Sequence, residues 1–168
     1  MQITISVAQT LLFTQNCEYD PDYYGTIAGG DLYFSRLIGR EEWKCASGGD
    51  KLAALFEATQ HIDRFNYLGT KATSNQYLQF PRGLNTTVPK DIEYATYEEA
   101  YQILCGRDIE DELESLRVHQ RKFGTLQTTY LQGVRPAPNV TAGILSSKAW
   151  RMIYPYFCQP DEIQLVRV

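Results

Sequence analysis

The sequence lacks the residue spacing of a metal site. Its four cysteines form no C-x-x-C pair, and neither His61 nor His119 stands at a metal-ligand spacing from any of them. No secretory leader opens the sequence, so we expect these thiols to be reduced in a cytosolic setting. We therefore predict neither a metal nor another cofactor. The cysteines are Cys17, Cys45, Cys105 and Cys158.

Motifs of common enzymes are also missing. There is no phosphate-binding G-x-x-x-x-G-K-[ST], no G-x-G-x-x-G and no G-x-S-x-G, and no serine or cysteine adjoins either histidine as an activated nucleophile. Glu18, Asp20 and Asp22 begin like a calcium loop, but Tyr23 stands where that loop needs glycine. No apolar run reaches membrane-spanning length. These absences predict that the protein is not an enzyme.

The charge is divided unevenly along the chain. Residues 1–114 carry 9 basic and 18 acidic side chains, a net charge of −9, whereas residues 115–168 carry 7 and 2, a net charge of +5. Such a division indicates two surfaces that face different partners. It is unlike a nucleic-acid-binding protein whose whole fold is basic.

A helix over residues 51–67 is the strongest local prediction. Ser47 with Asp50 forms a plausible N-terminal cap, and Gly69 suits a C-terminal cap. The apolar stripe recurs at steps of three and four, which predicts a core-packing helix. Its members are Leu52, Leu55, Phe56, Thr59, Ile62 and Phe65.

Three further helices complete the predicted bundle. The first spans residues 26–38, is capped by Thr26 and places Ile38 inward, with Trp43 in the connection that follows. The second begins at Pro89 and ends before Gly106, and its first half is rich in acidic residues. The third covers residues 148–154 after a Ser146–Ser147 cap. The predicted fold class is mainly α: a small helical bundle with a projecting β-hairpin and short terminal strands.

Residues 70–88 connect the helices as extended chain. Pro81 disfavours helix at Phe80, so we expect the Phe80 ring to enter the core. Arg82 then has two interpretations, hydrogen bonds to nearby carbonyls or contact with a partner.

Strand patterns lie near both termini and in the basic part. Residues 2–8 alternate like a short strand, and residues 116–121 and 125–131 predict a hairpin rich in arginine, glutamine and threonine. Residues 163–168 predict a terminal strand. That strand either pairs with residues 2–8 or adds to the edge of another chain.

Five carboxylates crowd into residues 108–114. With no histidine or aromatic residue nearby, we interpret this run as a solvated, self-repelling connector rather than an acid–base pair. Its members are Asp108, Glu110, Asp111, Glu112 and Glu114.

The ordered set of packing and capping residues resembles a tailed-phage family often labelled DnaT-like, which is similar to head–tail connector (adaptor) proteins. The resemblance covers residues 27–105 well and 115–168 more loosely. The residues that carry it include Trp43, Lys51, Ala54, Leu55, Ala58, Thr59, Ile62, Asp63, Gly69, Phe80, Pro81, Arg82, Pro89, Ile92, Ala95, Glu99, Ala100, Gly124, Tyr130 and Trp150.

The resemblance implies a structural virion protein. Copies would form a homo-oligomeric ring, commonly of twelve, between the portal protein and a stopper or tail-completion protein, while the double-stranded genome passes through without specific binding. The protein would be made in the host cytoplasm and reside at the virion neck. The alternative is a single-stranded-DNA-binding replication accessory protein.

Under the connector hypothesis, each surface receives a role. The portal contact is Ile163, Gln164, Leu165, Val166, Arg167 and Val168, and the hairpin contacts are Arg117, Arg121, Lys122 and Phe123. The acidic run of residues 108–114 would line the channel and repel phosphates. The predicted single domain divides into an N-terminal strand and loop (1–25), a helical core (26–106), an acidic connector, hairpin and loop (107–145), and a C-terminal helix and arm (146–168).

Overall fold

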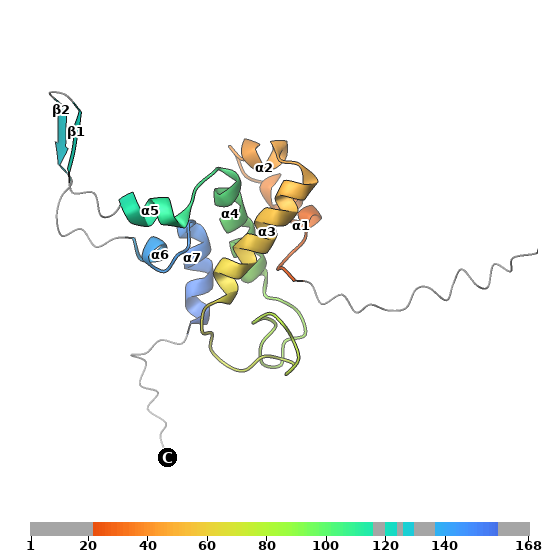
Figure 1. Ribbon diagram of the computed structural model, residues 1–168. Coiled ribbons are helices and arrows are strands. Elements are labelled where there is room, and N and C mark those ends of the chain that lie inside the picture. Colours follow the sequence, from red (N-terminus) through yellow and green to blue (C-terminus); the bar gives the residue numbers. More distant parts are fainter. Residues whose placement is uncertain (1–21, 116–119, 124–125, 130–136, 158–168) are drawn as a thin grey trace, which may run out of the picture.

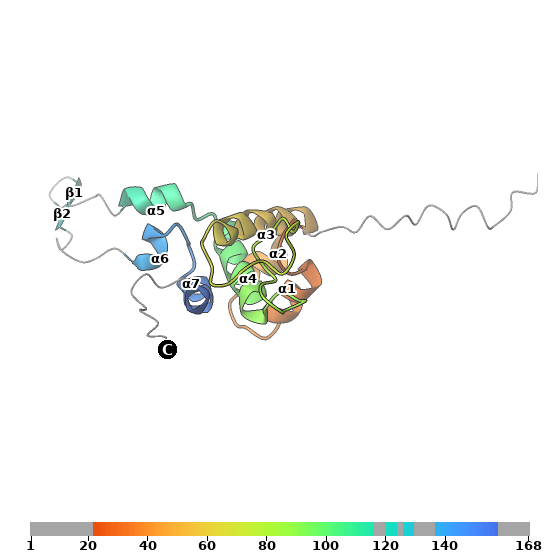
Figure 2. The ribbon, with the colours of Figure 1, turned by 90° about the horizontal axis from the view of Figure 1, so that it is seen from below.

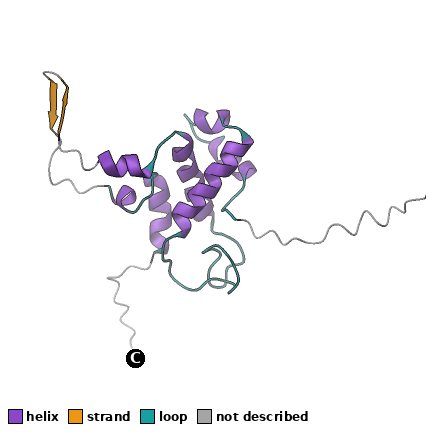
Figure 3. Ribbon diagram, viewed as in Figure 1, coloured by secondary structure: helices purple, strands orange, loops and turns teal. Residues whose placement is uncertain are grey.

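Helices make up most of the molecule, as predicted from the sequence (Figure 1). The computed structural model describes residues 22–115, 120–123, 126–129 and 137–157. Figure 3 shows helices in the body of the molecule and the two strands apart from it. The elements are α1 (Ile27–Phe34), α2 (Glu41–Cys45), α3 (Gly48–Asp63), α4 (Lys90–Leu104), α5 (Ile109–Ser115), β1 (Gln120–Phe123), β2 (Leu126–Thr129), α6 (Pro138–Thr141), α7 (Ser147–Ile153) and the 3-10 turn η2 (Tyr154–Tyr156).

Helices α3 and α4 pack against each other at the centre. The small side chains Ala54 and Ala58 are buried on α3, and Ala100 is buried on α4, so the two helices approach closely. The buried stripe of α3 is therefore rotated from the predicted one. Leu52 and Phe56, which we expected in the core, are 42% and 43% exposed.

The start of α3 is as predicted, but its end is not. Ser47 Oγ accepts a hydrogen bond from the Asp50 amide at 3.1 Å and donates one to the Asp50 carboxylate at 2.8 Å. The helix ends at Asp63, and Gly69, with φ of +78°, lies in the loop beyond it. Gly69 is thus a turn residue and not the predicted helix cap.

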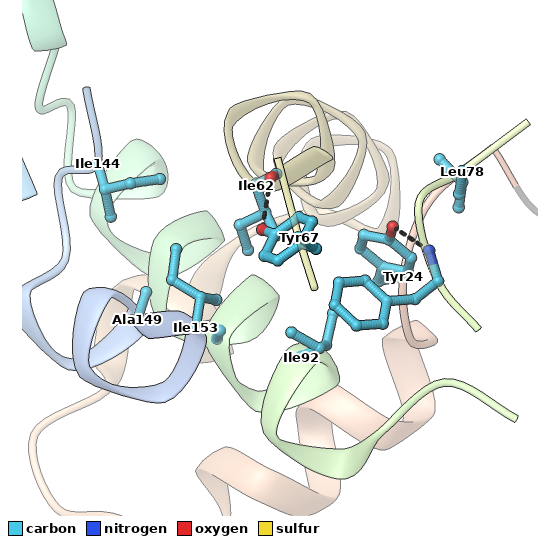
Figure 4. Packing of buried hydrophobic residues seen from close by; sticks show 10 residues of the cluster. Tyr24, Ile62, Tyr67, Leu78, Ile92, Ile144, Ala149 and Ile153 are labelled. Carbon is cyan, nitrogen blue, oxygen red and sulfur yellow. Dashed lines mark hydrogen bonds between the residues drawn. The ribbon is translucent and has the colours of Figure 1, made fainter. Parts of the chain in front are cut away.

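The core consists of two clusters on either side of the α3–α4 contact. One joins Phe34 and Trp43 to α3 and α4 through rings such as Tyr97. The other, drawn in Figure 4, joins Tyr24 and Phe80 to the isoleucines of α3, α4 and α7. The second cluster contains Tyr24, Ile62, Tyr67, Leu78, Phe80, Ile92, Ala95, Ile144, Ala149 and Ile153.

The N-terminal helix is shorter than predicted. Thr26 caps α1 by accepting from the Gly29 amide at 3.0 Å, as expected, but the helix ends at Phe34. The predicted inward position of Ile38 is wrong, because that side chain follows the helix and is fully exposed. Trp43 is buried as predicted, although it lies in α2 rather than in a loop.

Residues 64–88 form a lobe at the opposite end of the bundle from α2 (Figure 1). Figure 2, seen from below, looks onto this lobe with α3 and α4 behind it. Phe80 is buried, as predicted, and the Phe80–Pro81 peptide bond is cis. The Phe80 amide donates to Tyr24 Oη at 3.1 Å, which anchors the lobe to the core (Figure 4).

The later elements mix confirmed and corrected predictions. The hairpin is confirmed: β1 and β2 are antiparallel, with Arg121 opposite Thr128 and Phe123 opposite Leu126. The acidic run is helical in α5 rather than an irregular connector, and Asp108 Oδ1 accepts from the Glu110 amide at 2.8 Å. Ser146 caps α7 by accepting from the Ala149 amide, as predicted.

Some predictions lie outside the described residues. These are the strands at residues 2–8 and 163–168 and, within the hairpin prediction, Arg117. No helix in the described ranges is long and apolar enough to span a membrane.

Candidate functional site

Carboxylates hold most of the basic side chains of the helical bundle. Glu98, which is buried on α4, accepts from Arg40 at 3.3 Å and from Lys148 at 3.2 Å. Asp31 pairs with Lys51 at 2.9 Å, and this hydrogen bond, followed by one from Trp43, holds the pKa of Asp31 below its usual value. These pairs neutralise charge locally. The paired cations are Arg40, Lys44, Lys51, Lys90, Arg107 and Lys148.

Three cations in the lobe of residues 64–88 donate hydrogen bonds to neutral backbone carbonyls instead of pairing with carboxylates. Lys71 Nζ donates to the carbonyls of Gln76 and Tyr77 at 3.3 and 3.1 Å. Arg82 and Arg64 likewise bind backbone oxygens, and no described carboxylate lies within ion-pair distance of any of the three. A cation bound by a carbonyl keeps its charge, so these three side chains contribute a positive field at this end of the molecule.

Arg82 organises the loop around it. Its guanidinium donates to the Leu68 and Tyr67 carbonyls at 2.8 Å each, to the Gly69 carbonyl, and to Gln79 Oε1 at 2.8 Å. The sequence left two interpretations of Arg82 open, and the structure shows the first of them, hydrogen bonds to nearby carbonyls. The fork-shaped guanidinium can bind several acceptors at once, which a lysine cannot do in the same geometry.

Arg64 lies where α3 ends and reaches a different segment of the chain. Its Nη2 donates to the Ala142 carbonyl at 2.6 Å and to the Gly143 carbonyl, and its guanidinium carbon lies 5.4 Å from the centroid of the Phe65 ring. The side chain is exposed. Its position is thus set by neutral groups, and its charge faces solvent.

Two exposed aromatic rings accompany these cations. Tyr77 is 73% exposed and Phe56 is 43% exposed, and both line a cleft of about 260 Å³ between α3 and the lobe. Gln60 and Arg64, one helical turn apart on α3, line the same cleft. The complete lining is Asp22, Phe56, Thr59, Gln60, Asp63, Arg64, Tyr77 and Leu78.

The cleft also contains two carboxylates. Asp63 Oδ1 accepts from the Gln79 amide at 2.7 Å and from the Tyr24 hydroxyl, so its oxygen is used within the fold. Burial, and next the bond to Asp63, raises the pKa of Tyr24 far above its usual value, so this hydroxyl stays a donor. Asp22 is exposed. Phosphate groups are therefore disfavoured inside the cleft and favoured toward Arg64.

The residues predicted as sites are not brought together. Arg121, Lys122 and Phe123 lie in β1, away from the bundle in Figure 1, while Ile163 to Val168 and Arg117 lie outside the described residues. In α5, Glu112 pairs with Arg107 at 2.7 Å. No group of three or more histidine, cysteine or acidic side chains in the described ranges could hold a metal ion.

Sequence reasoning missed the cation–aromatic surface, which we define as Arg64, Lys71 and Arg82 with Phe56 and Tyr77. A signal was present: residues 64–90 contain four basic side chains and no acidic one, inside a part of the chain that is otherwise strongly acidic. Averaging charge over residues 1–114 concealed this segment. The grouping with Phe56, from α3, is visible only in the folded chain.

The comparisons with known proteins give one family. The model of the family described as "Putative DnaT-like ssDNA binding protein" matches residues 18–161. The chain belongs to this DnaT-like family. No curated protein and no solved structure matches it.

Membership confirms one part of the resemblance drawn from the sequence and overturns another. The DnaT-like assignment is confirmed, but the prediction of a virion head–tail connector is wrong, because the family is described by single-stranded DNA binding. The same finding contradicts the expected partners, which were the portal protein, a tail-completion protein and further copies in a ring. It also contradicts the passive passage of duplex DNA. The channel-lining role of the acidic residues 108–114 is not tested by this match.

Proposed function

We propose that this protein binds single-stranded DNA through the cation–aromatic surface. The observation that carries the proposal is that Arg64, Lys71 and Arg82 are held by carbonyls rather than by carboxylates. Their charge remains available to phosphates, and phosphate neutralisation supplies most non-specific affinity for nucleic acid. The family description of single-stranded DNA binding supports the same function.

The net charge of −4 opposes DNA binding by the molecule as a whole, but the charge is unevenly distributed, and the acidic side chains have little effect at the cation–aromatic surface. Ion pairs within the bundle neutralise many carboxylates, and Glu98 and Glu99 are buried. Screening over about 8–10 Å in physiological salt limits repulsion from acidic groups elsewhere. A DNA strand bound at the lobe is therefore affected chiefly by the electrostatic attraction of the nearby cations.

Exposed aromatic rings favour single-stranded over duplex DNA. Unpaired bases can stack on rings such as those of Phe56 and Tyr77, whereas bases in a duplex already stack on one another.

The test is a fluorescence-anisotropy titration with labelled oligothymidylate of about 16 nucleotides. Three phosphate contacts on a single strand predict a slope of log affinity against log salt of about −2. Lys71→Gln should weaken binding about fivefold in 0.1 M salt and make the slope shallower by about 0.7. Duplex DNA of equal length should bind more weakly than the single strand.

Lys44→Gln is the matched control, because it removes the same charge from a lysine that is paired with Glu41. It should leave affinity and slope nearly unchanged. Equal losses in the two variants would assign binding to overall charge rather than to this surface. No measurable binding by the wild type at low salt would refute the proposed function.

A further inference from the structure

The cleft between α3 and the lobe has the size and chemistry of a site for one flat ring. Phe56, from α3, and Tyr77, from the lobe, both line it, while the buried residues Thr59 and Leu78 line its inner part. Its volume of about 260 Å³ lies just below the range of roughly 300–1,000 Å³ typical of small-molecule pockets. It therefore suits one base rather than an extended ligand.

The inner part of the cleft cannot take up further hydrogen bonds easily. Thr59 Oγ1 donates to the Leu55 carbonyl at 2.8 Å and accepts from the Tyr24 amide at 3.0 Å. A ligand that enters must therefore be recognised by its faces and by groups at the rim.

Gln60 supplies the polar recognition at that rim. Its side-chain amide makes no hydrogen bond to another described residue, although it lines the cleft beside the aromatic rings. An amide offers both a donor and an acceptor, which is the combination that the edge of a nucleobase presents. Arg64, one turn after Gln60 and directly after the end of α3, lies on the side of the cleft that attracts phosphate.

The charge of the residues that line the cleft determines which part of a nucleotide can enter it. Asp22 and Asp63 line the cleft and repel a phosphate, whereas a neutral base meets no such penalty. Since the cations lie around Arg64 and on the lobe, the sugar–phosphate backbone is directed outside the cleft.

We infer that this cleft is a pocket for a single unpaired base of DNA, with stacking by Phe56 and Tyr77 and a hydrogen bond from Gln60. This inference rests on the proposed function and adds the part of the ligand that is recognised. It predicts discrimination against duplex DNA, because a paired base cannot enter without leaving its helix.

The experiment compares oligothymidylate with an abasic strand of the same length and the same phosphate charge. Wild-type protein should bind the base-containing strand roughly tenfold more tightly, the scale of one or two stacked bases. Phe56→Leu and Gln60→Ala should reduce this ratio toward one without changing affinity for the abasic strand. Lys71→Gln should weaken binding to both strands equally.

Leu52→Ala is the control on α3, since Leu52 is exposed to the same extent as Phe56 but does not line the cleft. Its ratio should equal that of the wild type, and thermal melting of every variant checks that it is folded. Equal affinity of the wild type for both strands would overturn the base pocket and the stacking role of Phe56 and Tyr77, while leaving phosphate binding by Arg64, Lys71 and Arg82 intact. Failure to bind either strand would overturn both.

Discussion

The helical bundle and the lobe of residues 64–88 differ in what holds their polar side chains. In the bundle, buried carboxylates join elements that are far apart in the sequence, as Glu98 does for Arg40 and Lys148. In the lobe, backbone carbonyls hold Arg82 and Lys71. Both solutions hold the cations by hydrogen bonds, although the buried Nε of Arg40 has no partner among the described residues, and only the first cancels the charge.

The difference shows that fold stability and surface potential can be set separately. A guanidinium bound to several carbonyls can fix a loop through charge-assisted hydrogen bonds. Because carbonyls are neutral, the lobe becomes structured and remains attractive to phosphates. Substitutions at Glu99, Arg82 and Asp31, with controls for the first two, test this comparison.

The largest expected effect is in the bundle, from Glu99→Ala. The Glu99 carboxylate is fully buried and accepts from the Leu145 and Ser146 amides at 2.9 and 2.8 Å, and its Oε1 lies 3.0 Å from His61 Nδ1. Removing it leaves two buried amides without an acceptor. We expect the free energy of unfolding to fall by about 3–5 kcal/mol, measured by urea denaturation.

The control for this substitution is Glu93→Ala, which removes a carboxylate from the exposed pair with Lys90. It should cost less than about 1 kcal/mol. A loss of similar size in the two variants would show that the buried carboxylate does not anchor the start of α7.

An intermediate effect is expected in the lobe, from Arg82→Gln. The substitution removes the bonds to the Tyr67, Leu68 and Gly69 carbonyls, and we expect a loss of about 1–3 kcal/mol in the free energy of unfolding. Amide exchange at residues 67–83 should accelerate while α4 stays protected. Affinity for single-stranded DNA should fall further than in Lys71→Gln, because the lobe loses both charge and shape.

Arg82→Lys separates these two contributions. It keeps the charge but cannot bind all of the carbonyls, so stability should fall much as in Arg82→Gln while the salt slope stays near that of the wild type. If Arg82→Lys were as stable as the wild type, the forked geometry would not hold the lobe.

The smallest effect is expected from Asp31→Asn, because the Asp31 side chain is half exposed, although its partner Lys51 is largely buried. The folded-state pKa of Asp31 lies below its usual 3.8, so its contribution to stability is present above that value and is lost as the pH falls through the folded-state pKa. Because the Asp31 carboxylate is half exposed and water screens it, the contribution is below about 1 kcal/mol. Melting temperatures between pH 6 and pH 3 should fall slightly less steeply in Asp31→Asn, and identical slopes would contradict this.

Local features of the fold were predictable from the sequence alone. The caps at Thr26, Ser47 and Ser146 and the hairpin all depend on neighbours within a few residues, which the sequence displays directly. Burial of Phe80 also followed, since Pro81 forces an extended chain.

Only the tertiary structure decided which face of α3 is buried and which side chains meet. Close packing against α4 selected the alanine face and left Phe56 exposed beside Tyr77. It also buried Glu98 and Glu99, which the sequence showed only as acidic residues of the helix that begins at Pro89. The physical reason is that the periodic pattern of apolar residues locates the buried face of a helix only approximately. Packing and the pairing of buried charges depend on contacts between segments that are distant in the sequence.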